Sequence, residues 1–500
     1  MVVQHNMQAA NANRMLNVTT SAQSKSTEKL SSGYRINRAA DDAAGLTISE
    51  KMRKQIRGLD QASTNAQDGV SSVQTAEGAL TEVHSMLQRM NELATQAANG
   101  TNSKDSDRQA IQDEIDQLTT EIDRVSETTK FNETYLLKGE AGTKTINMKA
   151  HDAGLKGKLT DNGDGTATFV MDTLNAGDKV SIGGKSYTIG SDDAEVDKWF
   201  TDNATDVANS ANKKVTVNGT EYTYYAAKAA NTTAGSLTDG WNAGWYASAP
   251  TDKGDGTGTA LSGKFADVDA IKAEVKKGAT VQNGTKSVTG MNDTTPKDGV
   301  SDTDATVISK NKAYELASKE LLKANQIGDT ENSAKVGVGN PATTINLTNG
   351  TGTFQIRTGS AKVANSLSFS LHVGADADMT NKIQVNIDAM DSASLGIKGL
   401  NVKDDSGNAA TYAVDAISDA ISKVSSQRSS LGAVQNRLEH TINNLDNVVE
   451  NTTTAESRIR DTDMAEEMVN YSKNNILAQA GQSMLAQANQ SNQGVLSLLQ

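Results

Sequence analysis

Between residues 73 and 97, apolar positions follow one another in alternating steps of three and four, which is the spacing of a coiled-coil seam. Such a stripe runs along one side of a helix, so it needs a partner helix to cover it. No proline occurs before Pro250, and proline inside a helix would cost about 3 kcal/mol. The members of this first stripe are Val73, Ala76, Leu80, Val83, Leu87, Met90, Ala94 and Ala97.

Two further stripes predict the partner helices. One spans residues 111–125 and follows a polar break at 99–102, where the chain should turn back as a helical hairpin. Ser106 and Gln109 have the spacing of a capping box at its start. The other spans residues 431–459 and has one slipped step. The three helices can therefore bury one another. The second stripe is Ile111, Ile115, Leu118, Ile122 and Val125. The third is Leu431, Val434, Leu438, Ile442, Leu445, Val448, Thr452, Ala455 and Ile459.

The length of the first helix predicts an extended shape. A continuous helix over residues 45–99 would be roughly 80 Å long at about 1.5 Å per residue, too long for a compact globule. A polar interruption at 460–463 separates the third stripe from a last helical segment, and Asp463 with Glu466 suits the start of that segment. The sequence therefore predicts a rod followed by a separate C-terminal helix.

The middle of the chain changes to strand periodicity. Residues 179–189 alternate around Gly183-Gly184, and residues 214–224 form a near copy around Asn218-Gly219. This repetition predicts a small β-rich module that is used twice. A helix is also expected at 311–325, with strands at 366–369 and 383–387.

Together these patterns predict a mixed α and β fold. We expect an elongated coiled-coil or helical-bundle rod built from both chain termini, with an inserted β-rich outer region over about residues 140–365. Aromatic residues make up only 4% of the chain, which favours thin helical packing over one bulky core. The three prolines and three tryptophans all lie in the middle, at Pro250, Pro296, Pro341, Trp199, Trp241 and Trp245.

Composition narrows the function classes. The net charge of -13 disfavours a nucleic-acid partner, because such proteins need a basic surface to release counterions. No stretch reaches the roughly 18 consecutive apolar residues of a membrane span, and residues 1–15 are too polar for a cleavable signal peptide. We therefore expect no membrane insertion and, if the protein is exported, a route without that signal. Cysteine is absent, so disulfides and thiolate metal sites are excluded.

Candidate chemistry is sparse. The five histidines are scattered and no H-E-x-x-H motif occurs, so no metal site is expected. The Asp-Gly runs at 160–166 and 251–257 lack the alternation of a calcium loop and are better explained as turns. The glycines at 337–339 precede Pro341 and indicate a loop. We expect no catalytic residue and no cofactor.

Motifs around the stripes are far more specific. Residues 30–45, LSSGYRINRAADDAAG, closely resemble the N-terminal signature of the bacterial flagellin family, with Tyr34 where leucine is commoner. The similarity continues through residues 58–80, 87–99 and 131–132. At the other end, segments 430–438, 455–468, 479–489 and 495–499 resemble the flagellin C-terminal motif. The resemblance covers both ends in the right order and leaves the middle unmatched.

The resemblance implies a subunit that polymerises into the flagellar filament for swimming motility. Residues 1–44 and 456–500 would form the terminal coiled coil that lines the filament channel. Residues 45–139 and 366–455 would form the helical rod domain with a β-hairpin, and residues 140–365 the exposed outer domains. The terminal segments would be disordered in the monomer and fold against neighbours during assembly.

The family also implies partners and assembly residues. The subunit would bind copies of itself in a helical homopolymer, the flagellar type III export apparatus, a chaperone and the filament cap. It would be extracellular, in the flagellar filament, and exported with an uncleaved N-terminus. The residues expected to serve subunit assembly are Leu30, Arg35, Ile36, Leu438, Ile459, Arg460, Met464, Met468, Leu485 and Leu496.

Animal hosts detect flagellins with a Toll-like receptor, and the resemblance places Arg89, Leu93 and Glu114 at receptor-contact positions. The alternative is that Leu93 packs beside the seam while Arg89 and Glu114 are solvated charges. Two other functions stay open. One is a minor filament or hook–filament junction subunit. The other is a filament subunit whose insertion acts as an adhesin or glycan-binding module through exposed Trp199, Trp241, Trp245 and Tyr246, for which core burial is the alternative.

Overall fold

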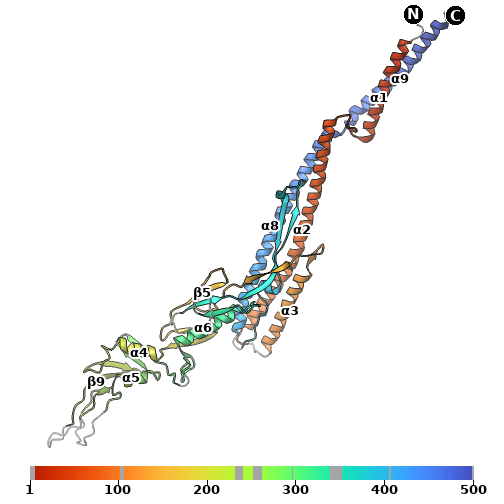
Figure 1. The fold of residues 1–500 in the computed structure, drawn as a ribbon. Coiled ribbons are helices and arrows are strands. Elements are labelled where there is room, and N and C mark those ends of the chain that lie inside the picture. The colour runs from red at the N-terminus through yellow and green to blue at the C-terminus, as the bar shows by residue number, and fades with distance from the viewer. Residues whose placement is uncertain are drawn as a thin grey trace. The chain divides into compact units, whose positions relative to one another are not determined.

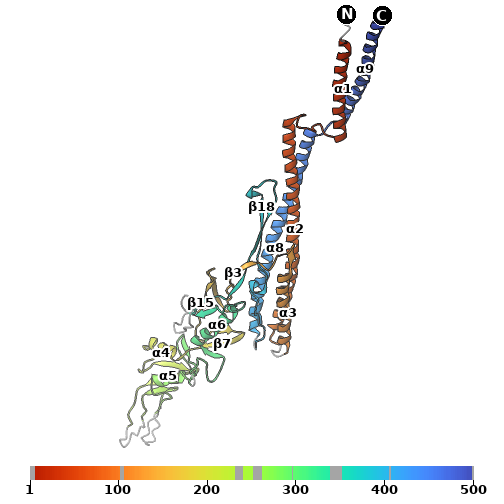
Figure 2. The same cartoon turned by 45° about the vertical axis from the view of Figure 1, so that its right-hand side comes forward.

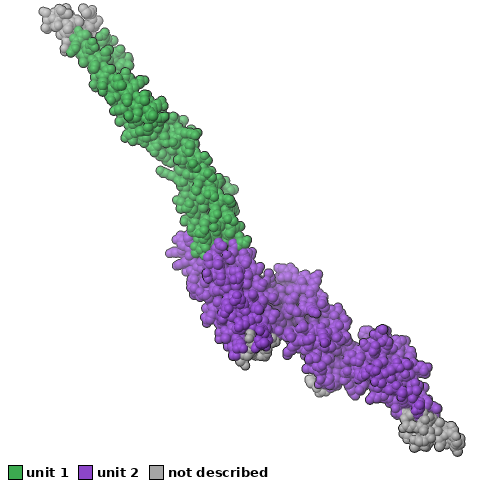
Figure 3. All heavy atoms as spheres, turned by 180° about the vertical axis from the view of Figure 1, so that it is seen from behind, with its two compact units in different colours: residues 1–75, 368–386, 429–500 green, residues 76–367, 387–428 purple. Residues whose placement is uncertain are grey.

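The structure is a computed structural model that describes residues 6–101, 106–230, 240–251, 262–294, 297–337, 352–404 and 407–497, with side chains described as far as Ser491. The chain forms two compact units (Figure 3). Unit 1 comprises residues 1–75, 368–386 and 429–500, and unit 2 comprises residues 76–367 and 387–428. Helices at both ends of the chain enclose a β-rich middle in the sequence, as the patterns predicted.

Unit 1 contains the first and last helices of the chain side by side. Helices α1 (Met7–Ser32) and α9 (Met464–Ser497) run antiparallel, with the two chain ends at the same end of the pair (Figures 1 and 2). Asn6 caps α1 by accepting a hydrogen bond from the amide of Ala9, and its own side chain donates to the carbonyl of Ala488 at 3.1 Å. Gly33 ends α1 in the left-handed conformation that favours glycine.

The rest of unit 1 consists of a β-hairpin with parts of two long helices. These helices are α2 (Ala43–Ala97) and α8 (Asn408–Arg460), and the hairpin strands are β17 (Leu367–His372) and β18 (Lys382–Ile387), with the 3-10 turn Met379–Asn381 between them. The hairpin packs against Ala66 of α2 and Leu438 of α8. A Cβ atom at Gly69 would lie 2.2 Å from Leu371, so glycine permits this close approach.

The burial of their side chains confirms the first two stripes. Every member of the first stripe is buried, and in α3 (Asp107–Thr128) Ile111, Ile115 and Ile122 are buried with Leu118 and Val125 half-buried. The predicted capping box is wrong. The hydroxyl of Ser106 donates to Asp107 beside it, its side chain makes no capping bond, and Gln109 donates to Asp113.

The members of the third stripe, on α8, differ in how deeply they are buried. Leu431, Leu438 and Leu445 are buried, whereas Val448 is exposed. The last stripe residues, Thr452, Ala455 and Ile459, are half-buried. The stripe is therefore less fully covered along the last turns of α8 than around Leu431 and Leu438.

Two cores form in the middle of the chain, within unit 2. The first gathers Phe169, Phe354, Tyr314 and Leu321 between strands and helix α6 (Lys310–Asn325), which confirms the predicted helix. Its strands form two sheets. The four-stranded sheet has the order β14 (Lys335–Gly337), β15 (Thr353–Arg357), β5 (Thr166–Met171), β4 (Gly157–Asp161). The three-stranded sheet has the order β13 (Val307–Ser309), β7 (Lys185–Gly190), β6 (Lys179–Ile182). Two-stranded pairs join β1 (Lys130–Phe131) to β2 (Thr134–Tyr135) and β3 (Glu140–Asn147) to β16 (Ser360–Asn365), the latter packing on α7 (Ser392–Leu395).

The second core has its own sheet and helices. Trp245, Phe265 and Phe200 pack between a five-stranded sheet and helices α4 (Asp193–Asp202) and α5 (Val268–Val275). The chain enters and leaves this body at Ser191 and Gly290, which form a β-bridge with each other. The sheet order is β10 (Gly244–Tyr246), β9 (Thr220–Tyr225), β8 (Lys214–Val217), β11 (Thr280–Asn283), β12 (Lys286–Thr289).

The predicted hairpins form, but not as one module used twice. β6 and β7 join through Gly183 and Gly184, both with positive φ, and belong to the three-stranded sheet. β8 and β9 join through Asn218 and Gly219, also with positive φ, and belong to the five-stranded sheet. A further hairpin, β11 with β12, turns at Gly284 and was not anticipated, although the Asn283-Gly284 pair is a known hairpin signal.

We predict that Leu87→Ala lowers the free energy of unfolding of unit 2 by about 2–5 kcal/mol, because Leu87 is fully buried in the seam and its loss leaves a cavity. Urea unfolding followed by circular dichroism measures the change. Glu82→Ala, at an exposed position on the same helix, is the control and should stay within about 0.5 kcal/mol of the original chain. Equal stability of the two variants would contradict the role of the seam.

Candidate assembly site

The connections between helices in unit 1 meet at one place, here called the junction: residues 33–42 between α1 and α2, and residues 459–463, which are the end of α8 and its connection to α9. Tyr34 and Asp461 form an antiparallel β-bridge. The amide of Arg35 donates to the carbonyl of Arg460 at 2.7 Å, and the amide of Thr462 donates to the carbonyl of Gly33 at 3.0 Å. The two crossing segments are thus tied by backbone hydrogen bonds.

Arg460 lies at the centre of the junction. Its guanidinium carbon is 4.6 Å from the centre of the Tyr34 ring, which is within cation–π range. Its Nη1 atom is 3.1 Å from Glu50 Oε1 and 4.0 Å from Glu456 Oε1, and Arg53 lies 3.5 Å from the same Glu456 oxygen. Only 14% of the Arg460 side chain is exposed, so these ion pairs are partly shielded from water.

Two polar atoms of this cluster lack a hydrogen bond. Arg460 Nε and Glu456 Oε1 are buried and have no hydrogen-bond partner among the described residues. The Tyr34 ring covers the guanidinium but cannot accept a directed hydrogen bond from Nε as a carbonyl would. The departure from leucine at position 34 therefore gives Arg460 an aromatic partner that leucine would not provide.

The residues of the N-terminal signature have separate tasks in the junction. The Asp41 carboxylate accepts hydrogen bonds from the amides of Arg38 and Asn37, and these bonds hold the pKa of Asp41 below its usual value. Asp42 accepts from the amide of Gly45 and starts α2. Ile36 is buried, and a Cβ atom at residue 45 would lie 2.7 Å from its Cδ1. The signature thus fixes a tight turn into α2.

On the C-terminal side, Asp463 caps α9, as predicted. Its carboxylate accepts hydrogen bonds from the amides of Ala465 at 2.9 Å and Glu466 at 3.2 Å. The hydroxyl of Ser457 donates to Asp461 at 2.7 Å, which fixes the end of α8. Arg35 adds a side-chain bond of 2.5 Å to the carbonyl of Ile459.

The structure brings most of the predicted assembly residues to this unit in two groups. Arg35, Ile36, Ile459 and Arg460 belong to the junction, and Leu30 and Met464 flank it on α1 and α9. The others lie farther along the helices, with Leu438 buried, Met468 exposed and Leu485 half-buried; the side chain of Leu496 lies outside the described residues.

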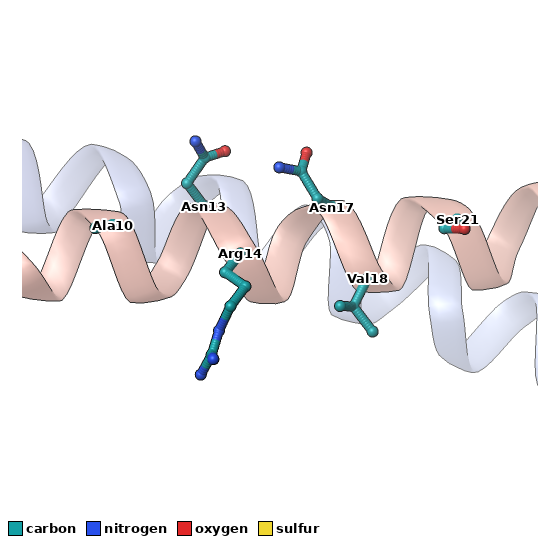
Figure 4. Close-up of a pocket in the computed structure, with 6 residues that line it drawn as sticks. All are labelled: Ala10, Asn13, Arg14, Asn17, Val18 and Ser21. Atoms are coloured by element: carbon teal, nitrogen blue, oxygen red, sulfur yellow. The ribbon is translucent and has the colours of Figure 1, made fainter.

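Sequence reasoning missed a feature of the same helices. Apolar side chains remain on the surface of α1 and α9, and a groove of about 900 Å³ between the helices is lined in part by Met15, Leu16, Leu477 and Met484. Figure 4 shows another face of α1, where Asn13 and Asn17 project from one side and Arg14 and Val18 from the other. The exposed large apolar residues of the pair are Met7, Met15, Val18, Met464, Met468, Val469, Ile476, Leu477 and Met484.

The three expected receptor contacts lie together in unit 2. Arg89 Nε donates to Glu114 Oε1 at 2.8 Å, which links α2 to α3, and Arg89 also pairs with Glu92. These bonds, first the one to Glu114, raise the pKa of Arg89, so it stays charged. Half of the Arg89 side chain and 44% of that of Glu114 are exposed, whereas Leu93 is buried.

The remaining candidates show no chemistry. Asp161 accepts from the amide of Gly163 and Asp164 from that of Thr166, which are ordinary turn contacts. The predicted turn at 251–257 and the loop beyond Gly337 fall largely outside the described residues. Within the described ranges, no group of three His, Asp or Glu side chains is placed to hold a metal ion. In that same part of the chain, no helix is both long and apolar enough to cross a bilayer.

The aromatic residues of the insertion are mostly interior. Trp245 is fully buried and donates Nε1–H to Asn209, and Tyr246 is buried beside it. Trp199 and Trp241 are half-buried, and the Lys228 amine lies 4.8 Å from the Trp241 ring centre. Trp245 and Tyr246 are thus core residues, so two of the four aromatic residues of the adhesin hypothesis are not exposed.

Helical ends that pair with each other, a β-rich middle and exposed apolar side chains on the terminal helices are features of an elongated subunit that binds through its helices. Family models agree. The model of the bacterial flagellin N-terminal helical region matches residues 3–142, and that of the C-terminal helical region matches residues 414–499.

Full-length relatives carry the comparison further. A flagellin of Clostridium tyrobutyricum is 38% identical over 496 residues, covering 99% of this chain and 100% of that protein. A flagellin of Bacillus subtilis (strain 168) is 34% identical over 500 residues, covering all of both chains, and flagellin B of Vibrio anguillarum is 33% identical over 99% of both. The chain belongs to the bacterial flagellin family. It is a structural subunit of the flagellar filament, which serves motility, and not an enzyme.

Among solved structures, that of FliC from Burkholderia pseudomallei covers 74% of this chain and 99% of its own, at 19% identity and a TM-score of 0.24. The family assignment rests on the sequence relatives.

We predict that Tyr34→Leu lowers the temperature at which filaments dissociate, because Arg460 loses a cation–π contact that contributes about 0.5–2 kcal/mol. Tyr34→Phe keeps the ring and should dissociate close to the original temperature. Calorimetry of filaments measures both. If the leucine and phenylalanine variants dissociate together, the ring of Tyr34 does not hold Arg460.

Proposed function

We propose that subunits join the filament through α1, α9 and the junction. The observation that carries this proposal is the set of large apolar side chains exposed along both terminal helices, from Met7 on α1 to Met484 on α9. Exposed apolar surface of this extent is typical of interaction sites, because burying it contributes about 25 cal/mol per Å². A filament subunit has copies of itself as the natural partner.

The junction would position this surface. Backbone bonds between residues 33–35 and 460–462 fix where the terminal pair begins, and the shielded ion pair of Arg460 with Glu50 holds the end of α8 to the first turns of α2. Arg460 Nε and Glu456 Oε1 make no hydrogen bond within the described residues, so a neighbouring subunit or a bound water would supply one.

The same proposal covers the division of the chain in the filament. Residues 1–44 with 456–500 would form the filament core and residues 45–139 with 366–455 the rod, while residues 140–365 would form the outer surface. Two hydrophobic cores that draw almost entirely on residues 140–365 support a separately folded outer region. Export through the flagellar apparatus with the N-terminal segment retained, aided by a chaperone and the filament cap, completes the proposal.

We predict that Ile476→Lys abolishes seeded filament elongation, because it places a charge in the exposed apolar face of α9 where a neighbour would bury it. Elongation from filament fragments is followed by light scattering and electron microscopy. Ser287→Lys, an exposed position on the outer strand β12, is the matched control and should elongate normally.

Normal elongation of Ile476→Lys would overturn the assembly surface. Failure of the unmodified chain to elongate at all, with binding only at fragment ends, would instead favour the hook–filament junction alternative.

We also propose that the exposed Arg89–Glu114 pair is a contact for the host Toll-like receptor that senses flagellin. The pair presents a positive and a negative group side by side on α2 and α3, at 2.8 Å from one another. Buried Leu93 would act by supporting the helix surface beneath them. Paired charges with preset geometry suit recognition by complementary groups on a partner.

We predict that Arg89→Ala weakens receptor binding by about tenfold or more, which corresponds to about 1.4 kcal/mol. Biolayer interferometry with the monomeric chain and the receptor ectodomain measures the affinity. Arg124→Ala removes another exposed arginine that pairs with a glutamate on α3 and should leave affinity unchanged. Unchanged affinity of Arg89→Ala would overturn the receptor assignment.

A further inference from the structure

The terminal helices concentrate the accessible sulfur of this chain. The chain has 14 methionines and no cysteine. Met90, Met148, Met171, Met291 and Met390 are buried. The strongly exposed methionines among the described residues are Met7 (75%), Met15 (57%), Met464 (49%), Met468 (51%) and Met484 (63%) on α1 and α9, and Met379 (73%) on the hairpin turn.

Exposed thioethers react with peroxide-class oxidants. A sulfur lone pair attacks one peroxide oxygen, the O–O bond breaks, that oxygen stays on sulfur as a sulfoxide, and the peroxide is reduced to water. No thiol in this chain competes for the oxidant. The product is polar and chiral, so a flexible apolar side chain becomes one that needs hydrogen-bond partners when buried.

We propose that Met7, Met15, Met464, Met468 and Met484 form a reversible oxidation site that controls whether a free subunit can join a filament. The inference rests on the proposed role of α1 and α9 in assembly. Met15 and Met484 line the groove between the helices, and Met468 lines an apolar hollow with Val469 and Ile476. Sulfoxides at these places put unsatisfied oxygens into surfaces that assembly would bury.

The free and the assembled subunit would differ in their sensitivity to oxidation. In the free subunit the five methionine residues are exposed to solvent. In a filament assembled through these helices they would be covered, so subunits are sensitive before incorporation and protected after it. Methionine sulfoxide reductases of the two stereochemical types return both sulfoxide epimers to the thioether, which makes the block reversible.

The test treats full-length monomer with hydrogen peroxide, removes the oxidant, maps sulfoxides by peptide mass spectrometry and measures seeded elongation. We expect sulfoxide at the five sites and at Met379, little at the buried methionines, and an elongation rate lower by about tenfold or more. The paired reductases should restore the rate. Oxidation of the five sites with undiminished elongation would overturn the proposal.

Leucine variants separate these five sulfurs from the rest, since Met→Leu nearly conserves volume. The chain with all five replaced should elongate at a rate that peroxide does not change, whereas the Met379→Leu chain should lose elongation after peroxide as the original chain does. Loss of elongation by the oxidised five-fold variant would overturn the proposal. If that variant does not elongate untreated, the M15L/M484L and M464L/M468L pairs replace it, and protection by neither pair overturns it.

The Ile476→Lys result distinguishes the two levels of inference. If that variant elongates, the assembly surface itself is wrong. If it is blocked while oxidised subunits elongate freely, assembly through α9 stands and only the oxidation site is wrong.

Discussion

The fold depends on one constraint: the apolar side chains along one face of a long helix must be buried against other helices rather than exposed to water. The stripe from Val73 to Ala97 is buried at every member, and the chain supplies cover partly from α3 nearby and partly from α8, hundreds of positions later. In unit 2 the ion pair of Glu77 with Arg428 marks one contact between α2 and α8, and in unit 1 the pair of Arg53 with Glu456 marks another. The two ends of the sequence must therefore fold together. The segment between α2 and α8 in the sequence is inserted between two helices that pack against each other.

The junction adds a second level to this partnership. Backbone bonds can hold two crossing segments whatever their side chains are. The largely shielded guanidinium of Arg460, by contrast, needs particular companions, and the chain provides Tyr34, Glu50 and Glu456. Burial of an arginine is costly unless charges and a ring surround it. The paired aspartates of the N-terminal signature divide the remaining work, since Asp41 shapes the turn and Asp42 starts the helix.

Sequence patterns predicted the structure where a single local requirement, such as the regular burial of one helix face or a positive φ angle in a turn, decides the residue type. The seam, the helix over 311–325, the cap at Asp463 and the hairpins with Gly183 and Asn218 were all predictable, because burial and positive φ leave clear marks. The capping box failed because Asp107, the next residue, takes the hydroxyl of Ser106. The hairpin of β11 and β12 was missed because its two strands are short and show little alternation of apolar and polar residues around Gly284. The Arg460 cluster joins residues more than four hundred positions apart, and no spacing rule reports such contacts.

The neighbouring entry and exit of the five-stranded body have a consequence for how the protein can change. Ser191 and Gly290 bridge each other, so the body between them closes on its own base. A longer, shorter or different segment placed between these two residues leaves the same gap to close, at a loop entropy that grows only slowly with length. A change of length or fold between Ser191 and Gly290 can thus leave the rest of unit 2 as it is.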